Sequence, residues 1–177
     1  GGRRQLADIA GRPMLARTLD TVLQLERRHP VTVVLGADIE RLEPLVRTTP
    51  ARVAFNPDHA QGMASSIRVG LAQAPSDARG VLIALADQVA VTADDLRQLV
   101  SRWEQHPDRI VAAQYEGTIG VPAIFPADLF RELAELQGDR GARVLLLRYP
   151  ERVIGVPMPS AAQDIDTPGD LSASTPR

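Results

Sequence analysis

The chain has 177 residues, a formal net charge of −2 and no cysteine. This length suits a single domain over residues 1–177, the mixed charges leave no basic face for nucleic acid, and no apolar run approaches the roughly 20 residues of a membrane span. Because the lack of cysteine excludes disulfides, thiolate catalysis and cysteine-bound zinc, we expect a soluble, cytoplasmic protein that acts on a small anionic ligand.

The first part of the chain predicts alternating helices and strands. The chain enters its first helix with no strand before it, so we expect an N-terminal strand and loop of the fold to be missing from the sequence. Apolar residues at helical spacing after Pro13 predict a helix that ends before His29. The next elements are strand 31–35, helix 39–46 with Pro44 inside it, strand 52–55, helix 63–74, strand 81–85, helix 92–105 and strand 110–114.

The last third continues this alternation. Residues 122–125 predict a strand that could run antiparallel to the others, and residues 127–136 predict a helix. Residues 138–142 form a turn into another helix, and residues 152–156 predict a late strand before a polar tail. Because the connections are short, this order predicts a three-layer α/β fold with a Rossmann-like, mostly parallel sheet.

The run from Val81 to Val89 is apolar through Ala86 and then becomes acidic at Asp87. Such a run, which follows Gly80 and precedes a polar turn, predicts a strand buried on both faces of a parallel sheet. Ligands of open α/β sheets bind at the carboxyl ends of the strands, where Asp87 could hold Mg²⁺ against substrate phosphates. An ordinary turn residue would have the same pattern, and position alone does not separate the two interpretations.

A second acidic cluster occupies residues 164–170, near the C-terminus. Asp164 and Asp166 are separated by one residue, so an extended backbone lets only one of them face a metal. A helix start with Thr167 as N-cap and Pro168 as first helical residue would explain part of the pattern. It does not explain the Asp-x-Asp that precedes it.

Residues 56–66 read Asn-Pro-Asp-His-Ala-Gln-Gly-Met-Ala-Ser-Ser and join a predicted strand to a predicted helix. They supply Gly62 for close backbone approach, the hydroxyls of Ser65 and Ser66, and amides near a helix N-terminus. These groups suit an anionic or polar ligand, although a capped loop without any ligand would also place serines there. The histidines of the chain show no metal-ligand spacing, so we expect no zinc site.

Two further polar clusters have an ordinary and a functional interpretation. Arg3, Arg4 and Arg12 form a solvated charge cluster, or they lie beside a triphosphate if a strand and a glycine-rich loop precede them. Gly138-Asp-Arg-Gly141 is typical of an ordinary turn that begins a helix.

The order of these pieces resembles the MobA/MocA-like nucleotidyltransferases, most closely the molybdenum cofactor cytidylyltransferases. The resemblance covers nearly the whole chain and implies a fold of the nucleotide-diphospho-sugar transferase type. Its specific elements are Asn-Pro-Asp…Gly-Met-x-Ser-Ser and Gly-Asp-x-Gly-Ala-Arg. The matching segments are Gln5-Leu6, Gly11-Arg-Pro13, Val34-Leu-Gly-Ala37, Asn56-Pro-Asp58, Gly62-Met-Ala-Ser-Ser66, Asp87-Gln88, Val91-Thr92, Gly120-Val-Pro122, Gly138-Asp-Arg-Gly-Ala-Arg143 and Asp164-Ile-Asp-Thr-Pro168.

The chain departs from the family pattern at several positions. The family's glycine-rich Leu-Ala-Ala-Gly-x-Ser-x-Arg-Met loop is absent, and Arg4 stands where the family has lysine. Ala86 replaces a glycine and Val89 a proline. Val121 stands where a histidine is common before Pro122, which removes a polar group from the side of the cleft expected to face a pterin.

The resemblance implies Mg²⁺-dependent transfer of the CMP group from CTP to the terminal phosphate of a molybdopterin-type cofactor, with release of pyrophosphate. The residues that it implies are Asp87 and Arg4 for catalysis, Asp87 and Asp166 for the metal, and Asn56, Asp58, Gly62, Ser65, Ser66 and Gln88 for nucleotide or substrate binding.

Two alternatives stay open. One is guanylyl or other nucleotidyl transfer to a different phosphorylated small molecule. The other is a non-catalytic protein that carries or inserts the cofactor. For the leading interpretation we expect CTP or GTP and a molybdopterin-type small molecule as ligands and a molybdoenzyme or a chaperone as a candidate protein partner, with no nucleic acid and no membrane.

Overall fold

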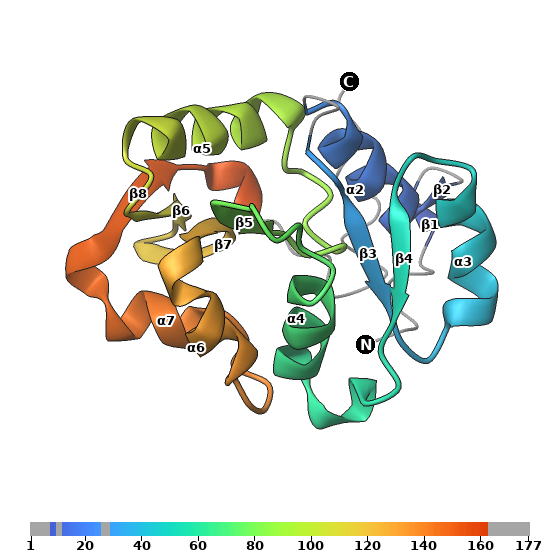
Figure 1. Cartoon of the computed structure of the whole chain (residues 1–177). Coiled ribbons are helices and arrows are strands. Elements are labelled where there is room, and N and C mark those ends of the chain that lie inside the picture. Colours follow the sequence, from blue (N-terminus) through green and yellow to red (C-terminus); the bar gives the residue numbers. More distant parts are fainter. Residues whose placement is uncertain (1–7, 10–11, 26–28, 163–177) are drawn as a thin grey trace, which may run out of the picture.

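A computed structural model gives the structure of residues 8–9, 12–25 and 29–162 (Figure 1). Its helices and strands, in chain order, are β1 (Asp8–Ile9), β2 (Arg12–Pro13), α2 (Met14–Leu23), β3 (Thr32–Leu35), α3 (Ile39–Arg47), β4 (Arg52–Phe55), α4 (Met63–Leu71), β5 (Gly80–Ile83), α5 (Ala93–Gln105), β6 (Ile110–Tyr115), β7 (Thr118–Pro126), α6 (Phe130–Ala134), α7 (Arg143–Arg148) and β8 (Val153–Pro157). Short 3₁₀ turns are η1 (His59–Gln61), η2 (Ala127–Leu129), η3 (Pro150–Arg152) and η4 (Pro159–Ala162). Within these ranges, no helix has the length and apolar character needed to cross a bilayer.

In the larger sheet, three of the four strands run in the same direction. The larger sheet has the order β5-β7-β6-β8, in which β7 is antiparallel to both of its neighbours and β6 is parallel to β8. β5 therefore runs in the same direction as β6 and β8. β3 and β4 form a separate parallel pair, from Thr32 opposite Arg52 to Leu35 opposite Phe55. The prediction of an α/β fold with a mostly parallel sheet is confirmed, including the antiparallel direction allowed for residues 122–125.

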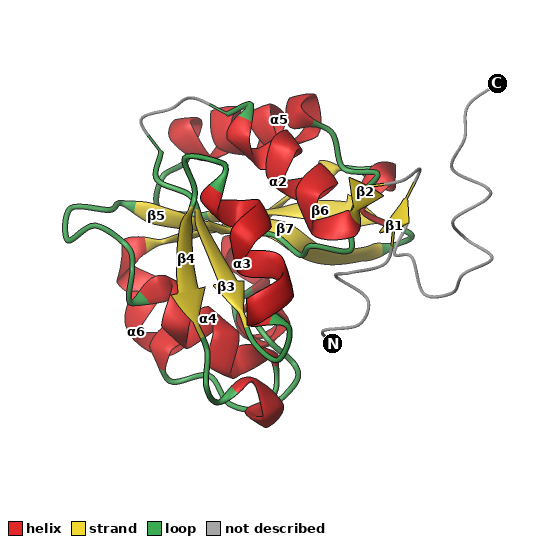
Figure 2. Ribbon diagram, turned by 90° about the vertical axis from the view of Figure 1, so that its right-hand side faces the viewer, coloured by secondary structure: helices red, strands yellow, loops and turns green. Residues whose placement is uncertain are grey.

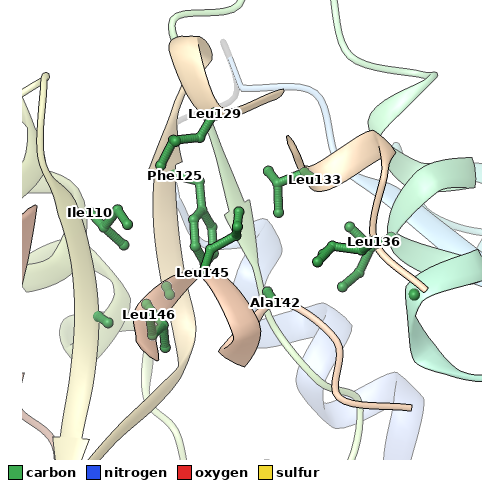
Figure 3. Close-up of a cluster of buried hydrophobic side chains, with 12 residues drawn as sticks. Ile110, Phe125, Leu129, Leu133, Leu136, Ala142, Leu145 and Leu146 are labelled. Carbon is green, nitrogen blue, oxygen red and sulfur yellow. The ribbon is translucent and has the colours of Figure 1, made fainter. Parts of the chain in front are cut away.

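Helices cover both faces of the larger sheet, which gives the predicted three layers (Figures 1 and 2). On one face, α4, α6 and α7 pack on β6 and β7 around Phe125, Leu133 and Leu145, each 0% exposed (Figure 3). On the other face, α5 contributes Leu96 and Leu99 to a second cluster. The alternating side chains of β6 and β7 serve both clusters, as expected for a sheet buried on both sides.

Helices α2 and α3 pack together on the β3–β4 pair. Leu42 and Val46 of α3 and Leu15 and Leu19 of α2 form a third cluster with Leu35 of β3. α4 contacts β3 as well, because Gly70 lets the helix approach the strand: a Cβ built there would lie 3.1 Å from Cγ2 of Val34. Helix α4 therefore packs against both the small parallel pair and the large sheet.

The prediction for strand 81–85 was wrong in its extent and burial. β5 spans Gly80–Ile83, and all of its residues are only partly buried. Among the strands described, only β7 pairs with it, so β5 is an edge strand. An apolar run in the sequence indicates that a segment has hydrophobic neighbours. It does not indicate whether the strand pairs with one neighbouring strand or with two. Residues 84–86 leave the strand and lead into the Asp87 turn.

Other boundaries differ in smaller ways. The helix predicted over 63–74 ends at Leu71, and the one predicted over 127–136 consists of η2 followed by the short α6. The strand predicted over 122–125 begins earlier, at Thr118. The two-residue strands β1 and β2 were not predicted, because two residues are too few to show any period.

Candidate active site

The turn after β5 places Asp87 beside a helix. The hydroxyl of Thr18 in α2 donates to the carbonyl of Ala86 at 2.8 Å, and the amide of Val89 donates to the carbonyl of Asp87 at 2.9 Å. The Asp87 side chain is partly buried, and its Oδ1 is buried without a hydrogen-bond partner among the described residues. A buried carboxylate oxygen in this state is costly unless something from outside compensates it.

A hard cation or a ligand donor would compensate this oxygen, so Asp87 fits a divalent metal. In the part of the chain that the structure describes, no group of three or more His, Asp or Glu side chains could hold a metal. Asp166, the predicted second ligand, and Arg4, the predicted cation at the triphosphate, both lie outside the described residues. Their roles therefore stay predictions.

Gln88, the next residue, is 3% exposed and points into the protein. Its Nε2 donates to the carbonyl of Val121 at 2.8 Å and to the carbonyl of Ala161 at 3.2 Å. Both N–H groups of the amide are therefore engaged internally. The predicted contact of Gln88 with substrate stays a prediction, but its donors are already committed to the backbone.

A buried hydrogen-bond network shapes the loop between β4 and α4. Asn56, 0% exposed, donates through Nδ2 to the hydroxyls of Ser65 at 2.8 Å and Ser66 at 3.0 Å. Its Oδ1 accepts from the amide of Asp58 at 3.0 Å, which is the Asx-turn pattern. The Ser65 hydroxyl lies 3.0 Å from the carbonyl of Asp58 and 2.8 Å from that of Gly62. Asn56 and Ser65 thus hold the loop from inside, whereas Asp58 is exposed.

This network predicts unequal effects of two neighbouring substitutions. We expect Ser65→Ala to destabilise the protein by about 1–3 kcal/mol, since it removes a buried hydroxyl and leaves the Asn56 amide short of a partner. Ser66→Ala removes one acceptor from a less buried position and should cost clearly less. Urea unfolding of both variants measures the difference, and equal losses would contradict this account of the network.

The second motif, at Gly138–Gly141, packs on the start of α4. Gly62 has φ +100°, and a Cβ built on it would overlap Oδ1 of Asp139 and lie 2.7 Å from the carbonyl carbon of Gly138. The Gly138 carbonyl accepts from the amide of Ala64 at 3.0 Å. A Cβ built on Gly141 would lie 2.9 Å from the sulfur of Met63. The turn is therefore more than an ordinary start of a helix, because it covers the N-terminus of α4.

This packing changes the expectation of an anion site at the α4 N-terminus. The amide of Ala64 is used by Gly138, and the amide of Ser65 donates to the carbonyl of Gly62 at 3.2 Å. Amides that already have partners are not available to an anion. The two sequence motifs are brought together, but as one packed unit with exposed side chains at its surface.

His59 belongs to this surface and was not predicted as a site residue. It is exposed in η1, and its imidazole lies over Gly36, just after β3: a Cβ on Gly36 would be 2.8 Å from Cγ of His59. Only a glycine at position 36 leaves room for the imidazole ring of His59. The sequence signal that could have pointed to this contact is Gly36 itself, a glycine directly after a strand rich in β-branched residues. Gly36, Asn56 and Asp87 all follow the carboxyl ends of strands, the position of ligand sites in open α/β sheets.

The residues flanking the Gly138–Gly141 turn are joined by polar contacts. The Tyr149 hydroxyl donates to the carboxylate of Glu132 at 2.8 Å, and Arg148 pairs with the same carboxylate at 2.8 Å. The hydrogen bond from Tyr149, together with the hydrogen bond and charge of Arg148, lowers the pKa of Glu132 below its ordinary value of 4.5. Glu132 and Tyr149 thereby link α6 to the end of α7 on the two sides of the turn.

This lowered pKa predicts a pH dependence of stability. A carboxyl with a depressed folded-state pKa stabilises the fold above its unfolded pKa and loses this effect as the pH falls through the folded value. Glu132→Gln should therefore be less stable than the wild type near pH 7, by a small amount because the Glu132 side chain is still partly exposed to solvent, and the gap should close at acid pH. Urea unfolding at both pH values tests this, with exposed Glu104→Gln as control. A gap that does not narrow as the pH falls would contradict it.

Comparison with known proteins shows the family to which the chain belongs. A family model described as the MobA-like NTP transferase domain matches residues 1–153. The chain belongs to the MobA-like NTP transferase family. The resemblance drawn from the ordered motifs is thereby confirmed at the level of the family.

Among curated relatives, nicotine blue oxidoreductase of Paenarthrobacter nicotinovorans is 32% identical over 177 residues, covering 94% of this chain and 84% of that protein. The purine catabolism protein PucB of Bacillus subtilis is 31% identical over 134 residues, covering 75% of this chain and 62% of that protein. The crystal structure of Rv0371c from Mycobacterium tuberculosis in complex with manganese matches with a TM-score of 0.81 and 27% identity, over 98% of this chain and 91% of that one.

Proposed function

We propose that this MobA-like transferase domain catalyses divalent-metal-dependent nucleotidyl transfer, with CTP as donor and the phosphate of a molybdopterin-type cofactor as acceptor. The observation that carries the proposal is Oδ1 of Asp87, in the turn after β5, which is buried without a partner among the described residues of a chain of this family. The manganese in the Rv0371c structure supports a divalent ion as cofactor, and Mg²⁺ is the ion we propose here.

In the proposed reaction, an oxygen of the acceptor phosphate attacks the α-phosphorus of CTP. One P–O bond forms there, the bond from the α-phosphorus to the bridging oxygen breaks, and pyrophosphate leaves with the electron pair. A bound ion would neutralise charge on the triphosphate. Asp87 and Asp166 would hold it, and the guanidinium of Arg4 would add positive charge at the phosphates.

The protein's own part is to position the reactants. Asp58, Gly62 and Ser66 of the loop between β4 and α4 would contact nucleotide or acceptor, since Asp58 is exposed and Ser66 is partly exposed. Asn56 and Ser65 are buried and would act by holding that loop in shape. A rigid loop matters because orientation of the reactants supplies much of the rate in phosphoryl transfer.

The test is pyrophosphate release by the protein when it is given Mg²⁺, molybdopterin and either CTP or GTP. Release with CTP supports the proposal. Release with GTP only, or with another phosphorylated acceptor, would favour the first alternative. Nucleotide binding without pyrophosphate from any combination would favour a carrier of the cofactor. No binding of either nucleotide would contradict all three.

A second candidate comes from the relative named nicotine blue oxidoreductase, which aligns with 94% of this chain. An oxidoreductase built on this domain would need a reduced cofactor as electron donor, and we choose a nicotinamide dinucleotide for the test because its pyrophosphate resembles part of a triphosphate. Incubation with NADH or NADPH and nicotine blue tests this candidate. Consumption of the reduced nicotinamide without pyrophosphate release would replace the transferase proposal.

A further inference from the structure

We propose that Gln88 is a positioning residue, which fixes the Asp87 turn against two distant parts of the backbone and thereby sets the affinity for the divalent ion. This inference rests on the proposed function, in which Asp87 is a metal ligand. It assigns to Gln88 a role behind the site, in place of the direct substrate contact expected from sequence.

The first anchor of Gln88 is an irregularity in the sheet. Between β6 and β7 the register shifts, so that Ala112 lies opposite Ala123 while Ala113 lies opposite Gly120. The residues between them on β7 face no partner on β6, and pairing with β5 ends at Ala123. The carbonyl of Val121 therefore has no place in either ladder, and Nε2 of Gln88 satisfies it at 2.8 Å.

The second anchor is the carbonyl of Ala161, in the 3₁₀ turn η4, which Nε2 of Gln88 reaches at 3.2 Å. This turn is itself fixed: the amide of Met158 donates to the carbonyl of Gln114 at 2.8 Å, and the hydroxyl of Ser160 donates to Asp95 at 2.8 Å. One side chain thus joins β7 and η4 to the residue next to Asp87.

Among side chains of this length, only that of glutamine carries two N–H donors on one uncharged nitrogen. The amide oxygen, Oε1 of Gln88, is buried without a partner among the residues described, which lowers the stability of the fold. Stability alone therefore does not explain why a glutamine occupies position 88. An apolar side chain of similar size would remove that unsatisfied oxygen and so offset part of the loss of the two hydrogen bonds.

On the other side of the turn, Thr18 in α2 holds the carbonyl of Ala86. Without Gln88, the hydroxyl of Thr18 would be the remaining side-chain anchor of residues 86–88 within the described structure. The carboxylate of Asp87 would then sample more orientations, and a metal ligand that must first be ordered binds more weakly.

The experiment compares Gln88→Met, similar in size but without N–H donors, with wild type, Asp87→Asn and the exposed control Gln98→Met. Mn²⁺ binding, alone and with CTP, is followed by the water-proton relaxation enhancement of bound Mn²⁺, and the melting temperature is recorded in parallel. We expect Gln88→Met to weaken Mn²⁺ binding about tenfold or more, while Gln98→Met matches the wild type.

Wild-type affinity in a folded Gln88→Met protein would overturn the inference and leave the proposed function standing. If wild type and Asp87→Asn bind Mn²⁺ equally, Asp87 is not a ligand, and both the inference and the metal part of the proposed function are wrong. Should Gln88→Met not fold, Gln88→Asn takes its place, because it keeps the amide on a shorter side chain. It should weaken binding at least about threefold, and unchanged affinity would equally overturn the inference.

Discussion

Replacing Asp87 by asparagine should lower the rate of pyrophosphate release at least about a thousandfold, because charge stabilisation by a bound divalent ion contributes several kcal/mol to phosphoryl-transfer transition states. Asparagine has nearly the same shape but lacks the negative charge. We expect the free energy of unfolding to be no lower than that of the wild type, since Oδ1 of Asp87 makes no hydrogen bond within the described structure that the substitution could break.

The matched control for this prediction is Asp77→Asn. Asp77 is exposed and forms no hydrogen bond or ion pair in the described structure, so its loss removes the same charge far from any proposed role. Activity and urea unfolding should both stay at wild-type values. An Asp87→Asn enzyme that keeps its activity would show that the carboxylate is an ordinary turn residue, which was the other interpretation of the sequence.

Much of the fold follows from local sequence signals. β4 lies at 52–55 as predicted, because Pro50 and Asn56-Pro57 limit the strand on both sides. β7 shows where such signals fail. It begins at Thr118, after a tight turn in which Glu116 has φ 49° and Gly117 has φ 74°, the geometry of a two-residue hairpin. Gly120 and Pro122 interrupt the alternation that would have predicted the strand from its start.

The candidate site could be predicted only where chemistry and strand ends coincide. Asp87 was identified because an acid after an apolar run is visible in sequence. The engagement of Gln88 was not visible, since it depends on a sheet irregularity at Val121, thirty-three residues later. For the same reason, Asn56 was expected at the ligand, but its bonds to Ser65 and Ser66 turn it inward. Residue type predicts which polar groups matter, and packing decides which of them face the ligand.

The largest stability loss should follow Gly62→Ala. Gly62 has φ 100° and ψ −178°, a conformation open essentially to glycine alone, in which another residue costs about 1–3 kcal/mol. An added Cβ would also overlap Oδ1 of Asp139 and lie 2.7 and 2.8 Å from the carbonyl carbon and oxygen of Gly138. We therefore expect a total loss of about 3 kcal/mol or more, with weaker nucleotide binding because the loop between β4 and α4 must move.

Gly117→Ala is the control that separates backbone strain from steric overlap as causes of the stability loss in Gly62→Ala. Gly117 also has a positive φ, 74°, but a Cβ built on it meets no atom of the described residues within 4 Å. Its replacement should cost only the backbone term, about 1–2 kcal/mol, as measured by urea unfolding. Adding Asp139→Ala to Gly62→Ala should recover only part of the difference, because the contacts with the Gly138 backbone remain. If Gly62→Ala costs no more than Gly117→Ala, the two motifs are not packed as one unit, and the loop proposed to bind the nucleotide is not held by the turn at Gly138–Gly141.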